Sequence, residues 1–479
     1  MNTAQDQTPL FDALIKHERR KAASFHVPGH KSGKLFPGPA MNWYRQLLTL
    51  DVTELPGLDD LHAPDGAIRE AERLLSDLYG SDESWLLIGG STVGNLAMLR
   101  AACTRDDRVL IQRNAHQSIL NGVKLLGLRP VFLAPRLDAE SGLAVTPTPS
   151  ALKGALERYP DVKAVVITNP NYYGLTADLR KLIAEAHRHG IPALVDEAHG
   201  AHFVAGDPFP ASALSCGADA VVHSAHKTLP AMTMGAYLHV QGTRVSREKV
   251  KESLRMLQSS SPSYPILASL DLARAFAANF KNQNKDEFWE AIEKLRGQLR
   301  EFPSFSLIEG TAKDKAYERI DPLKVTLQSR CRLSGFQLAE RLREKAIDVE
   351  LADPAHVLFV LPLSRTSDFD RLIAALNSVL KGIPPLETLT KAVVPELPWI
   401  AAPVPIEGRK THVVPLQAAE GLIAAEEVTP YPPGVPVLVR GEPITASHIE
   451  TIRNWHEAGG RFQAGADAMA AGIRVVDEE

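Results

Sequence analysis

The sequence predicts an α/β fold in which a mostly parallel sheet of seven strands carries helices on both faces and a smaller α+β domain follows. Seven short apolar runs recur between residues 84 and 240, and the segments between them have the apolar spacing of amphipathic helices. The runs are apolar at consecutive positions, as expected of strands that are buried on both faces. Polar residues gather at their carboxyl ends, where open α/β sheets bind ligands.

Changes in pattern divide the 479 residues into three predicted segments. Residues 1–55 form an N-terminal arm, whose stretch SFHVPGHKSG is expected to be irregular because of its glycines and proline. Residues 56–300 form the large domain with the sheet, and helices are expected in its last part. Residues 301–479 form the C-terminal α+β domain, which includes a Pro-rich connection and a tail.

The composition is that of an ordinary globular enzyme, with 44% hydrophobic and 23% charged residues. A formal charge of -4 gives no general attraction to nucleic acid or to an anionic membrane, so neither partner is expected. Cys103, Cys216 and Cys331 are widely spaced and form no CxxC pair, which favours a reducing compartment. Because we find neither a membrane-spanning run nor a signal peptide, we expect a cytoplasmic protein.

Lys227 follows the apolar run in the stretch ADAVVHSAHK. A lysine in this position is usually a surface residue whose aliphatic stem covers the core. Here Ser224 and His226 add hydrogen-bonding groups, and a lysine in a dry site has a lowered pKa that makes the neutral amine available to an aldehyde. Lys227 is therefore a candidate for covalent chemistry with an aldehyde-bearing cofactor.

A second polar group, VDEAHGAH, ends another apolar run. Asp196 is a candidate partner for the protonated ring nitrogen of pyridoxal phosphate (PLP), which acts as an electron sink only while that nitrogen keeps its proton; a helix N-cap is the alternative. His199 is either a donor to the phenolic oxygen of that cofactor or a structural histidine. His199 and His202 also suggest a metal site, but a third ligand at suitable spacing is missing, so no metal is expected.

The stretch LIGGSTVGNLAM places Gly89 and Gly90 at a strand end and Ser91 and Thr92 at the start of a helix. Small residues let the backbone approach an anion, and the free N–H groups and dipole of a helix N-terminus favour phosphate. The stretch matches neither common glycine-rich nucleotide-binding pattern, and alone it is typical of a tight turn and cap. His116, in RNAHQS, either stacks on a flat cofactor ring or caps the next helix.

Taken in order, GGSTVGN, RNAHQS, TNPNYYG, DEAHGAH and SAHKT resemble the fold-type I PLP enzymes, and specifically the ornithine/lysine/arginine decarboxylase family. The resemblance covers nearly the whole chain. Further stretches that are similar to the family are FHVPGHKSG in the arm, LPGLDDLHAPDGAI ahead of the sheet, and TPYPPGVPVLVRGE and GGRFQAGAD in the tail.

The resemblance implies a role for each matching residue. Lys227 matches the lysine that bonds to the cofactor aldehyde, and Asp196 matches the partner of the pyridinium nitrogen. His116 matches the histidine that stacks on the ring, and His199 matches the contact to the phenolic oxygen. The expected catalytic residues are Lys227, His199 and Asp196. The implied cradle for the cofactor phosphate consists of Ser91, Thr92, Ser224 and His226.

The resemblance also implies the activity, which is decarboxylation of a basic L-amino acid. Long members of the family begin with a flavodoxin-like wing domain, whereas this sequence starts almost directly at the arm, so the short biosynthetic bacterial type is expected. Arginine is then the expected substrate, giving agmatine and CO2 for polyamine biosynthesis, with lysine or ornithine as alternatives. An aminotransferase or other fold-type I enzyme is a further alternative. A non-catalytic regulatory paralogue is another, against which the presence of Lys227 and Asp196 argues.

A cationic substrate needs a carboxylate partner, and the stretch TELPGLDDLHAPDGAIREAE has six acids against one basic residue, Arg69. We expect some of these acids to face the substrate and most to be solvated. They are Glu54, Asp59, Asp60, Asp65, Glu70 and Glu72. The resemblance also implies a homodimer or larger assembly with arm residues reaching across. In the tail, Leu422 or Ile423 stands where the family is expected to have arginine.

Overall fold

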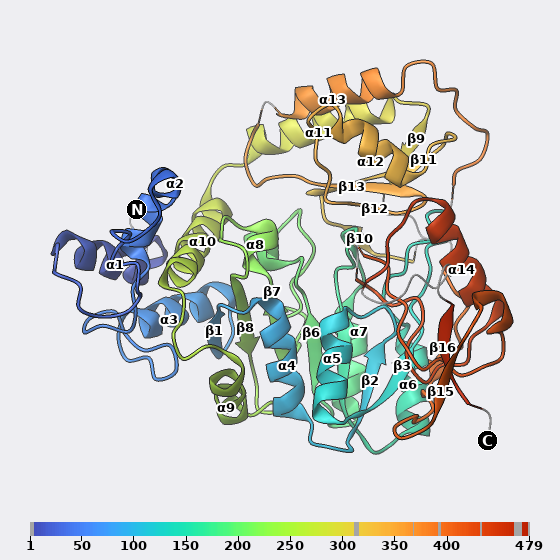
Figure 1. Cartoon of the computed structure of the whole chain (residues 1–479), viewed down its shortest axis with the longest axis horizontal. Helices are drawn as coiled ribbons and strands as arrows, with labels where there is room; N and C mark the ends of the chain where they lie inside the picture. Colours follow the sequence, from blue (N-terminus) through green and yellow to red (C-terminus); the bar gives the residue numbers. More distant parts are fainter. Residues whose placement is uncertain are drawn as a thin grey trace.

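The structure is a computed structural model that describes residues 4–310, 316–366, 368–390, 394–431, 434–463 and 472–477. A sheet of eight strands lies at the centre of the molecule (Figure 1). In spatial order, its strands are β1 (Glu83–Leu87), β8 (Ala236–Val240), β7 (Ala220–His223), β6 (Ala193–Asp196), β4 (Val162–Thr168), β2 (Arg108–Gln112), β3 (Arg129–Leu133) and β14 (Ile400–Ala401).

Five adjacent strands, from β7 to β3, run parallel to one another, which confirms the mostly parallel sheet. Strand β8 is antiparallel to both of its neighbours. Each of the seven predicted runs forms a strand of this sheet. The sheet has one strand more than predicted, because β14, from the C-terminal part of the chain, pairs with β3. This pairing covers backbone groups that an edge strand would otherwise expose.

Alternate residues of the strands face hydrophobic clusters on opposite sides of the sheet. In β6, Ala193 and Val195 belong to one cluster and Leu194 belongs to the other. Helices packed on the first side are α1 (Pro9–Arg19), α3 (Ala67–Tyr79), α6 (Pro149–Arg158), α7 (Leu179–Arg188) and α10 (Tyr264–Asn282). Helices packed on the second side are α4 (Gly90–Ala102), α5 (Gln117–Leu126) and α9 (Arg247–Leu257). The expectation of helices on both faces is confirmed.

Local sequence signals set the ends of these helices. The hydroxyl of Thr148 accepts a hydrogen bond from the backbone N–H of Ala151 and so caps α6. Pro149 follows in the first turn, where a backbone N–H has no partner within the helix, so the proline costs no hydrogen bond. Helix α5 ends at Gly127, whose φ of 64° is costly for residues with a side chain.

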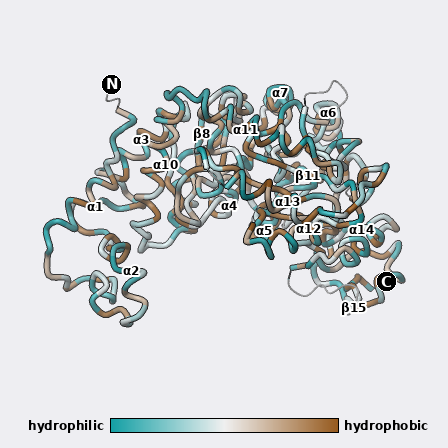
Figure 2. Tube along the Cα trace, turned by 90° about the horizontal axis from the view of Figure 1, so that it is seen from above, coloured by the Kyte–Doolittle hydropathy of each residue, from teal (hydrophilic) through white to brown (hydrophobic). Residues whose placement is uncertain are grey.

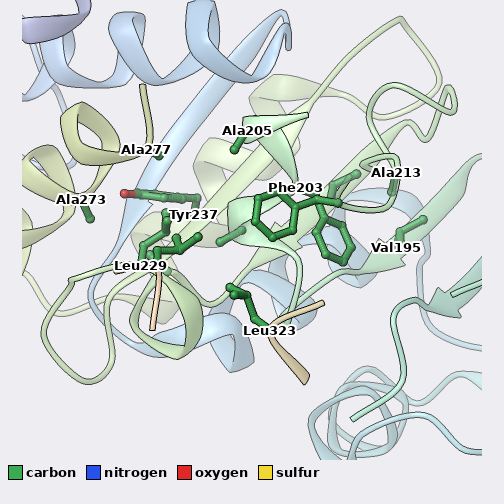
Figure 3. Packing of buried hydrophobic residues seen from close by; sticks show 14 of the residues in the cluster. Val195, Phe203, Ala205, Ala213, Leu229, Tyr237, Ala273, Ala277 and Leu323 are labelled. Carbon is green, nitrogen blue, oxygen red and sulfur yellow. The ribbon is translucent and has the colours of Figure 1, made fainter. Parts of the chain in front are cut away.

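A second, antiparallel sheet lies beside the large one and carries helices α11 (Asp286–Arg300), α12 (Gly335–Arg343) and α13 (Asp368–Val379) (Figure 1). Its strands are β12 (Leu351–Ala352), β13 (His356–Val360), β11 (Lys324–Ser329) and β9 (Phe305–Leu307). The two parts share one hydrophobic cluster, in which Figure 3 shows Leu323 together with Phe203 and Leu229. A short pairing between β5 (Leu175–Thr176) and β10 (Arg319–Ile320) also joins them.

The arm and the tail lie at opposite ends of the molecule (Figure 2). The arm contains α2 (Gly38–Leu50) and a short 3-10 helix, η1 (Ala4–Asp6), and the tail contains η3 (Leu416–Ala418), α14 (Ala446–Glu457) and the pair β15 (Thr411–Val414) and β16 (Ile473–Val476). Part of the tail motifs, at residues 432–433 and 464–467, lies outside the described residues. The division into three segments stays a prediction. Within the described ranges, no helix is long and apolar enough to cross a membrane.

Glu72, on helix α3, is buried in the core with 1% of its surface exposed. Its Oε1 accepts a hydrogen bond from the backbone N–H of Leu86 at 3.3 Å, whereas its Oε2 has no partner. Burial raises the pKa of this carboxyl from 4.5 to about 8. Glu72 therefore keeps its proton in the folded chain at neutral pH.

We predict that Glu72→Gln stabilises the protein increasingly as the pH rises from 4.5 to 8. The unfolded chain loses the Glu72 proton near pH 4.5 and the folded chain only near pH 8, so the native glutamate costs stability across that window, by on the order of 2–4 kcal/mol at its upper end. Urea unfolding of both proteins at several pH values measures the difference. Glu70→Gln, on the exposed face of the same helix, is the control. A Glu72→Gln difference that does not change with pH would contradict the assignment.

Candidate active site

A cavity of about 770 Å³ lies at the carboxyl edge of the parallel strands. Its lining includes residues that end or follow β2, β3, β4 and β6, together with the segment after β7. Five of the eight predicted cofactor residues line it, namely Ser91, His116, Asp196, His199 and Lys227. The other three do not line the cavity: Thr92 and His226 adjoin the lining residues Ser91 and Lys227 in the chain, and Ser224 donates a hydrogen bond to Ser91. Residues that the sequence placed at or after strand ends thus lie around one cavity, and their roles toward a cofactor stay predictions.

Asp196 ends β6 with 3% of its surface exposed. Its Oδ2 accepts a hydrogen bond from Nδ2 of Asn95 at 3.0 Å, and its Oδ1 accepts one from the backbone N–H of Ala198 at 3.2 Å. Asn95 also donates to the hydroxyl of Ser118, which is bonded to Nδ1 of His116. This chain of bonds fixes the carboxylate at the cavity wall. Asp196 is not the N-cap of a helix: the following 3-10 helix η2 (Ala201–Ala205) begins after Gly200.

His116 caps a helix, which is one of the two roles that its sequence position left open, while stacking on a cofactor ring stays a prediction. Its side chain accepts a hydrogen bond from the backbone N–H of Ser118 and so caps α5. Its ring also lines the cavity. Burial lowers the pKa of His116, while the charge of Asp196 opposes this effect. The cap thus holds a neutral, flat ring at the cavity wall.

Lys227 lies in the single turn α8 (Ala225–Thr228), which follows β7 directly. Its Nζ is 3.1 Å from Nε2 of His199 and 5.2 Å from the centre of the Tyr172 ring. Burial lowers the pKa of the Lys227 amine, and the carboxylates of Asp196 and Glu350 partly restore it. A lysine with a lowered pKa supplies more neutral amine at physiological pH, as chemistry with an aldehyde requires.

The residues proposed for a phosphate cradle gather around the start of α4. The hydroxyl of Ser224 donates to the hydroxyl of Ser91 at 2.8 Å, and Thr92 is exposed in the first turn. Gly90, with φ of 74°, takes a backbone conformation that favours glycine and lets the strand turn sharply into the helix. His226 is bonded to the carbonyl oxygen of Gly235. Of these four residues only Ser91 lines the cavity, and it stands in the first turn of a helix, where free N–H groups favour a phosphate.

Family models identify the chain. The model described as Orn/Lys/Arg decarboxylase, major domain, matches residues 8–368, and the model of the C-terminal domain matches residues 394–463. The chain belongs to the Orn/Lys/Arg decarboxylase family. The expected family and the fold-type I architecture are therefore confirmed.

Similar proteins extend over most of this decarboxylase-family chain. The uncharacterized protein YaaO of Bacillus subtilis (strain 168) is 46% identical over 451 residues, which cover 93% of each chain. The arginine decarboxylase of the same organism is 34% identical, with 99% of each chain covered. Among solved structures, lysine decarboxylase A from Pseudomonas aeruginosa matches with a TM-score of 0.79 at 21% identity, covering 99% of this chain and 81% of that one. That likeness supports the fold.

The family implies PLP as cofactor, and the residues of the cavity fit it. Lys227 offers an amine, Asp196 a fixed carboxylate and His116 a flat ring, all on the wall of one cavity. Asn114 and Thr168 also line the cavity, and each has a buried side-chain oxygen without a hydrogen-bond partner. Buried polar atoms without partners in a cavity are typical of a ligand site. No group of three or more potential metal ligands occurs in the described part of the chain.

The six acids upstream of the sheet do not line this cavity in the single chain. Both oxygens of Asp59 accept backbone N–H bonds from the residues around the start of α3, including Gly66 and Ile68. Glu70 pairs with Arg73 on the surface, and Glu72 is buried in the core. Their role toward a substrate stays a prediction that requires a second subunit.

Several residues of the decarboxylase site were missed in the sequence. Asn95 lies in GGSTVGN and Tyr172 in TNPNYYG. These motifs identified both segments as part of the site, but they did not predict that Asn95 bonds to Asp196 or that Tyr172 lies beside Lys227. Lys324, whose Nζ is 3.1 Å from Nδ1 of His199, comes from β11, in the smaller sheet. Only its position in the apolar run PLKVTL was a signal, because a lysine inside a buried strand is unusual.

Arg113 and Glu442 join the motif RNAHQS to the tail. The guanidinium Nε and Nη2 of Arg113 donate to the two carboxylate oxygens of Glu442 at 2.7 and 2.8 Å, and both side chains are buried. Arg113 also donates to the carbonyl oxygens of Pro436 and Val437, which line the cavity. The pair thus holds the tail segment in place as part of the cavity wall.

We predict that Glu442→Ala lowers the stability of the folded protein by about 3–5 kcal/mol, because it leaves the buried charge of Arg113 without a partner. Chemical unfolding monitored by fluorescence provides the measurement. Glu457→Ala, which removes an exposed carboxylate 3.9 Å from Nε of Arg453, is the matched control and should change stability by less than about 1 kcal/mol. Equal effects of the two substitutions would show that the buried pair does not hold the tail.

Proposed function

We propose that this chain is a PLP-dependent decarboxylase that converts L-arginine to agmatine and CO2, and that it serves polyamine biosynthesis in the cytoplasm. The observation that carries the proposal is that Lys227 and Asp196, from two different strand ends, line one cavity. The choice of arginine is supported by four relatives at 32–34% identity that are named arginine decarboxylase. Lysine and ornithine remain the alternative substrates.

PLP, when bound, supplies a ring that accepts the electrons of the bond to be broken at Cα of the substrate. Asp196 would hold the proton on the ring nitrogen, since its carboxylate is fixed by two hydrogen bonds and is shielded from water. Lys227 would hold the cofactor through its amine and, with His199 beside it, would return a proton to Cα of the substrate. The ring of Tyr172 packs on His199 and keeps water from the Lys227 amine.

The guanidinium of the substrate requires a carboxylate near the cavity. Glu350 raises the pKa of Lys227 and of Lys324 through its charge, so its carboxylate acts on the site. Glu396 lines the cavity. Glu350 and Glu396 are our candidates for the carboxylate that binds the guanidinium within one chain. The six upstream acids are further candidates, which a second subunit would have to supply.

We predict that the purified protein with PLP releases agmatine from arginine and much less amine from lysine or ornithine, as measured by mass spectrometry. Lys227→Ala should abolish turnover and the visible absorbance of the lysine-bonded cofactor, because it removes the amine that bonds to the aldehyde. Lys249→Ala, on the exposed side of α9, is the control and should leave both unchanged. Formation of a keto acid would favour an aminotransferase. A protein without cofactor absorbance or turnover would support the regulatory paralogue.

We further propose that the chain forms a homodimer through its arm. Helix α2 buries only Leu48 among its 13 residues. Large apolar residues of the arm are exposed: 94% of the surface of Phe25, 71% of that of Leu35 and 88% of that of Trp43 is accessible to solvent. Several large apolar side chains exposed on one segment are typical of a protein–protein interface. A second copy of the chain is the partner that the family resemblance implies.

We predict that light scattering on the purified protein gives at least twice the mass of the 479-residue chain. Trp43→Glu should shift the protein toward monomer, because burying the new charge in an apolar interface is unfavourable. Glu301→Lys, at the end of α11 and away from the arm, is the control. A wild-type protein that is monomeric at micromolar concentration would contradict the proposal.

A further inference from the structure

A continuous chain of hydrogen bonds connects His116 to Asp196 behind the cavity wall. Nδ1 of His116 is 2.9 Å from the hydroxyl oxygen of Ser118. Nδ2 of Asn95 is 2.8 Å from the same oxygen and 3.0 Å from Oδ2 of Asp196. Ser118, Asn95 and Asp196 are each no more than 3% exposed. Two groups that line the cavity, from the start of α5 and the end of β6, are therefore joined out of contact with bulk water.

A backbone N–H at one end fixes the direction of every bond in this chain. The N–H of Ser118 lies 3.2 Å from Nδ1 of His116 and only donates, so Nδ1 is the acceptor and carries no hydrogen. The hydrogen between Nδ1 and the Ser118 hydroxyl therefore belongs to the hydroxyl. Because that hydrogen is used, the hydroxyl oxygen accepts one from the amide nitrogen of Asn95. The second amide hydrogen goes to the carboxylate of Asp196.

The opposite orientation of the Asn95 amide fails at Asp196. It would place the amide oxygen against the carboxylate, where neither atom has a hydrogen to donate. In the orientation found, Oδ1 of Asn95 is buried and has no partner in the described part of the chain. Leaving a buried oxygen unpaired costs stability. Asn95 therefore acts in this wall through its two hydrogens.

Two glycines bring the helices close enough for these bonds. A Cβ atom on Gly94 would lie 2.8 Å from a side chain of β7, so α4 packs directly on the sheet one residue before Asn95. A Cβ atom on Gly122 of α5 would lie 2.6 Å from Leu99 of α4. Gly122 lies four residues after Ser118, and Leu99 four residues after Asn95, so each pair shares a helix face. The close contact of α4 with α5 thus places Ser118 beside Asn95.

We propose that Asn95 and Ser118 are positioning residues that hold Asp196 as a hydrogen-bond acceptor and His116 as the uncharged tautomer with its hydrogen on Nε2. This inference rests on the proposed function, which places the cofactor ring against Asp196 and His116. A protonated pyridine ring beside a charged imidazole would be unfavourable because both are cations. One buried amide thus controls both groups that face the ring.

The charged and titratable groups near His116 agree with an uncharged ring. Burial lowers the pKa of His116, the charge of Lys227 acts in the same direction, and the charge of Asp196 opposes them. His199 is a further neighbour, and burial lowers its pKa well below the usual range, so it adds no positive charge at neutral pH.

The tail covers the other nitrogen of His116. A Cβ atom on Gly434 would lie 3.7 Å from Nε2 of His116 and 3.6 Å from the ring of Tyr431. Glu427 of the tail accepts a hydrogen bond from Nε2 of Gln117 at 2.6 Å, in the next position of the chain. Within the described ranges, no acid of the tail bonds to Nε2 of His116. The tail therefore gives a charged imidazole no ion-pair partner.

The test is NMR of the ligand-free, full-length protein labelled with ¹⁵N-histidine, which reports the tautomer and the pKa of His116. Asn95→Asp keeps the shape of the side chain but offers the Ser118 hydroxyl an acceptor, so the hydroxyl turns away from His116. Asn95→Leu removes both donors and adds no charge. Asn121→Asp makes the same chemical change at an exposed position of α5 and is the matched control. His116→Gln assigns the signal.

We expect hydrogen on Nε2 of wild-type His116 and a pKa below its ordinary value of 6.5. In Asn95→Asp the pKa of His116 should rise by about one unit or more, because Nδ1 loses the hydroxyl donor and a carboxyl group lies close by. Asn95→Leu should give a smaller rise, since the Ser118 oxygen becomes free to accept from a charged imidazole. Asn121→Asp should leave the titration nearly unchanged.

Binding of PLP supplies a second measurement. The affinity of Asn95→Asp for PLP should be weaker than that of the wild type by about tenfold at pH 6.5, because binding then requires His116 to lose its added proton. Part of this loss should be recovered at pH 8.5, where His116 is again uncharged. A purely structural role would weaken binding equally at both pH values.

Hydrogen on Nδ1 of wild-type His116 would overturn the proposal. Wild-type titration of His116 in folded Asn95→Asp would also overturn it, and if that variant does not fold, the same result in Asn95→Leu decides. The proposed function fails separately, if the wild-type protein does not bond PLP at Lys227. The NMR measurement needs no cofactor and in that case still decides the roles of Asn95 and Ser118.

Discussion

Burial of charged and polar side chains at the carboxyl edge of the large sheet is the constraint on which the site depends. A carboxylate with 3% exposure at the end of a strand is unfavourable unless donors compensate for the lost water. Asp196 receives two such donors, from Asn95 and from the backbone of Ala198. Both donors are neutral, so the carboxylate keeps its negative charge available to a cation in the cavity. The two neutral donors therefore both stabilise the buried carboxylate and leave it able to bind a cation.

The same constraint connects distant parts of the chain. Asn95 in α4 bonds both to Asp196 and, through Ser118, to the cap of α5. Arg113, which also lines the cavity, holds the tail by a buried ion pair with Glu442. Asp196, His116 and Arg113 each have a hydrogen-bond partner from another part of the chain, so this part of the cavity wall depends on the packing of several elements.

Much of the site could be predicted because it lies at strand ends. Asp196 and Lys227 each follow a continuous apolar run, and adjacent parallel strands bring such ends to one edge. For His116 the sequence left two roles open; the structure shows that it caps α5 and that its ring lines the cavity. The positions of the six upstream acids could not be predicted in this way. Asp59 accepts backbone N–H bonds at the start of α3, Glu70 forms a surface ion pair with Arg73, and Glu72 is buried in the core. Charge in the sequence does not say which way a side chain faces.

The sequence by itself determined the family, the layered α/β architecture and the residues that end the strands, because apolar periodicity and short ordered motifs are local properties of a chain. Only the tertiary structure decided the eighth strand, the pairing of Arg113 with Glu442, and the approach of Lys324 to His199. These contacts join residues separated by more than a hundred positions. They depend on how two sheets and a tail pack together, which no local pattern encodes.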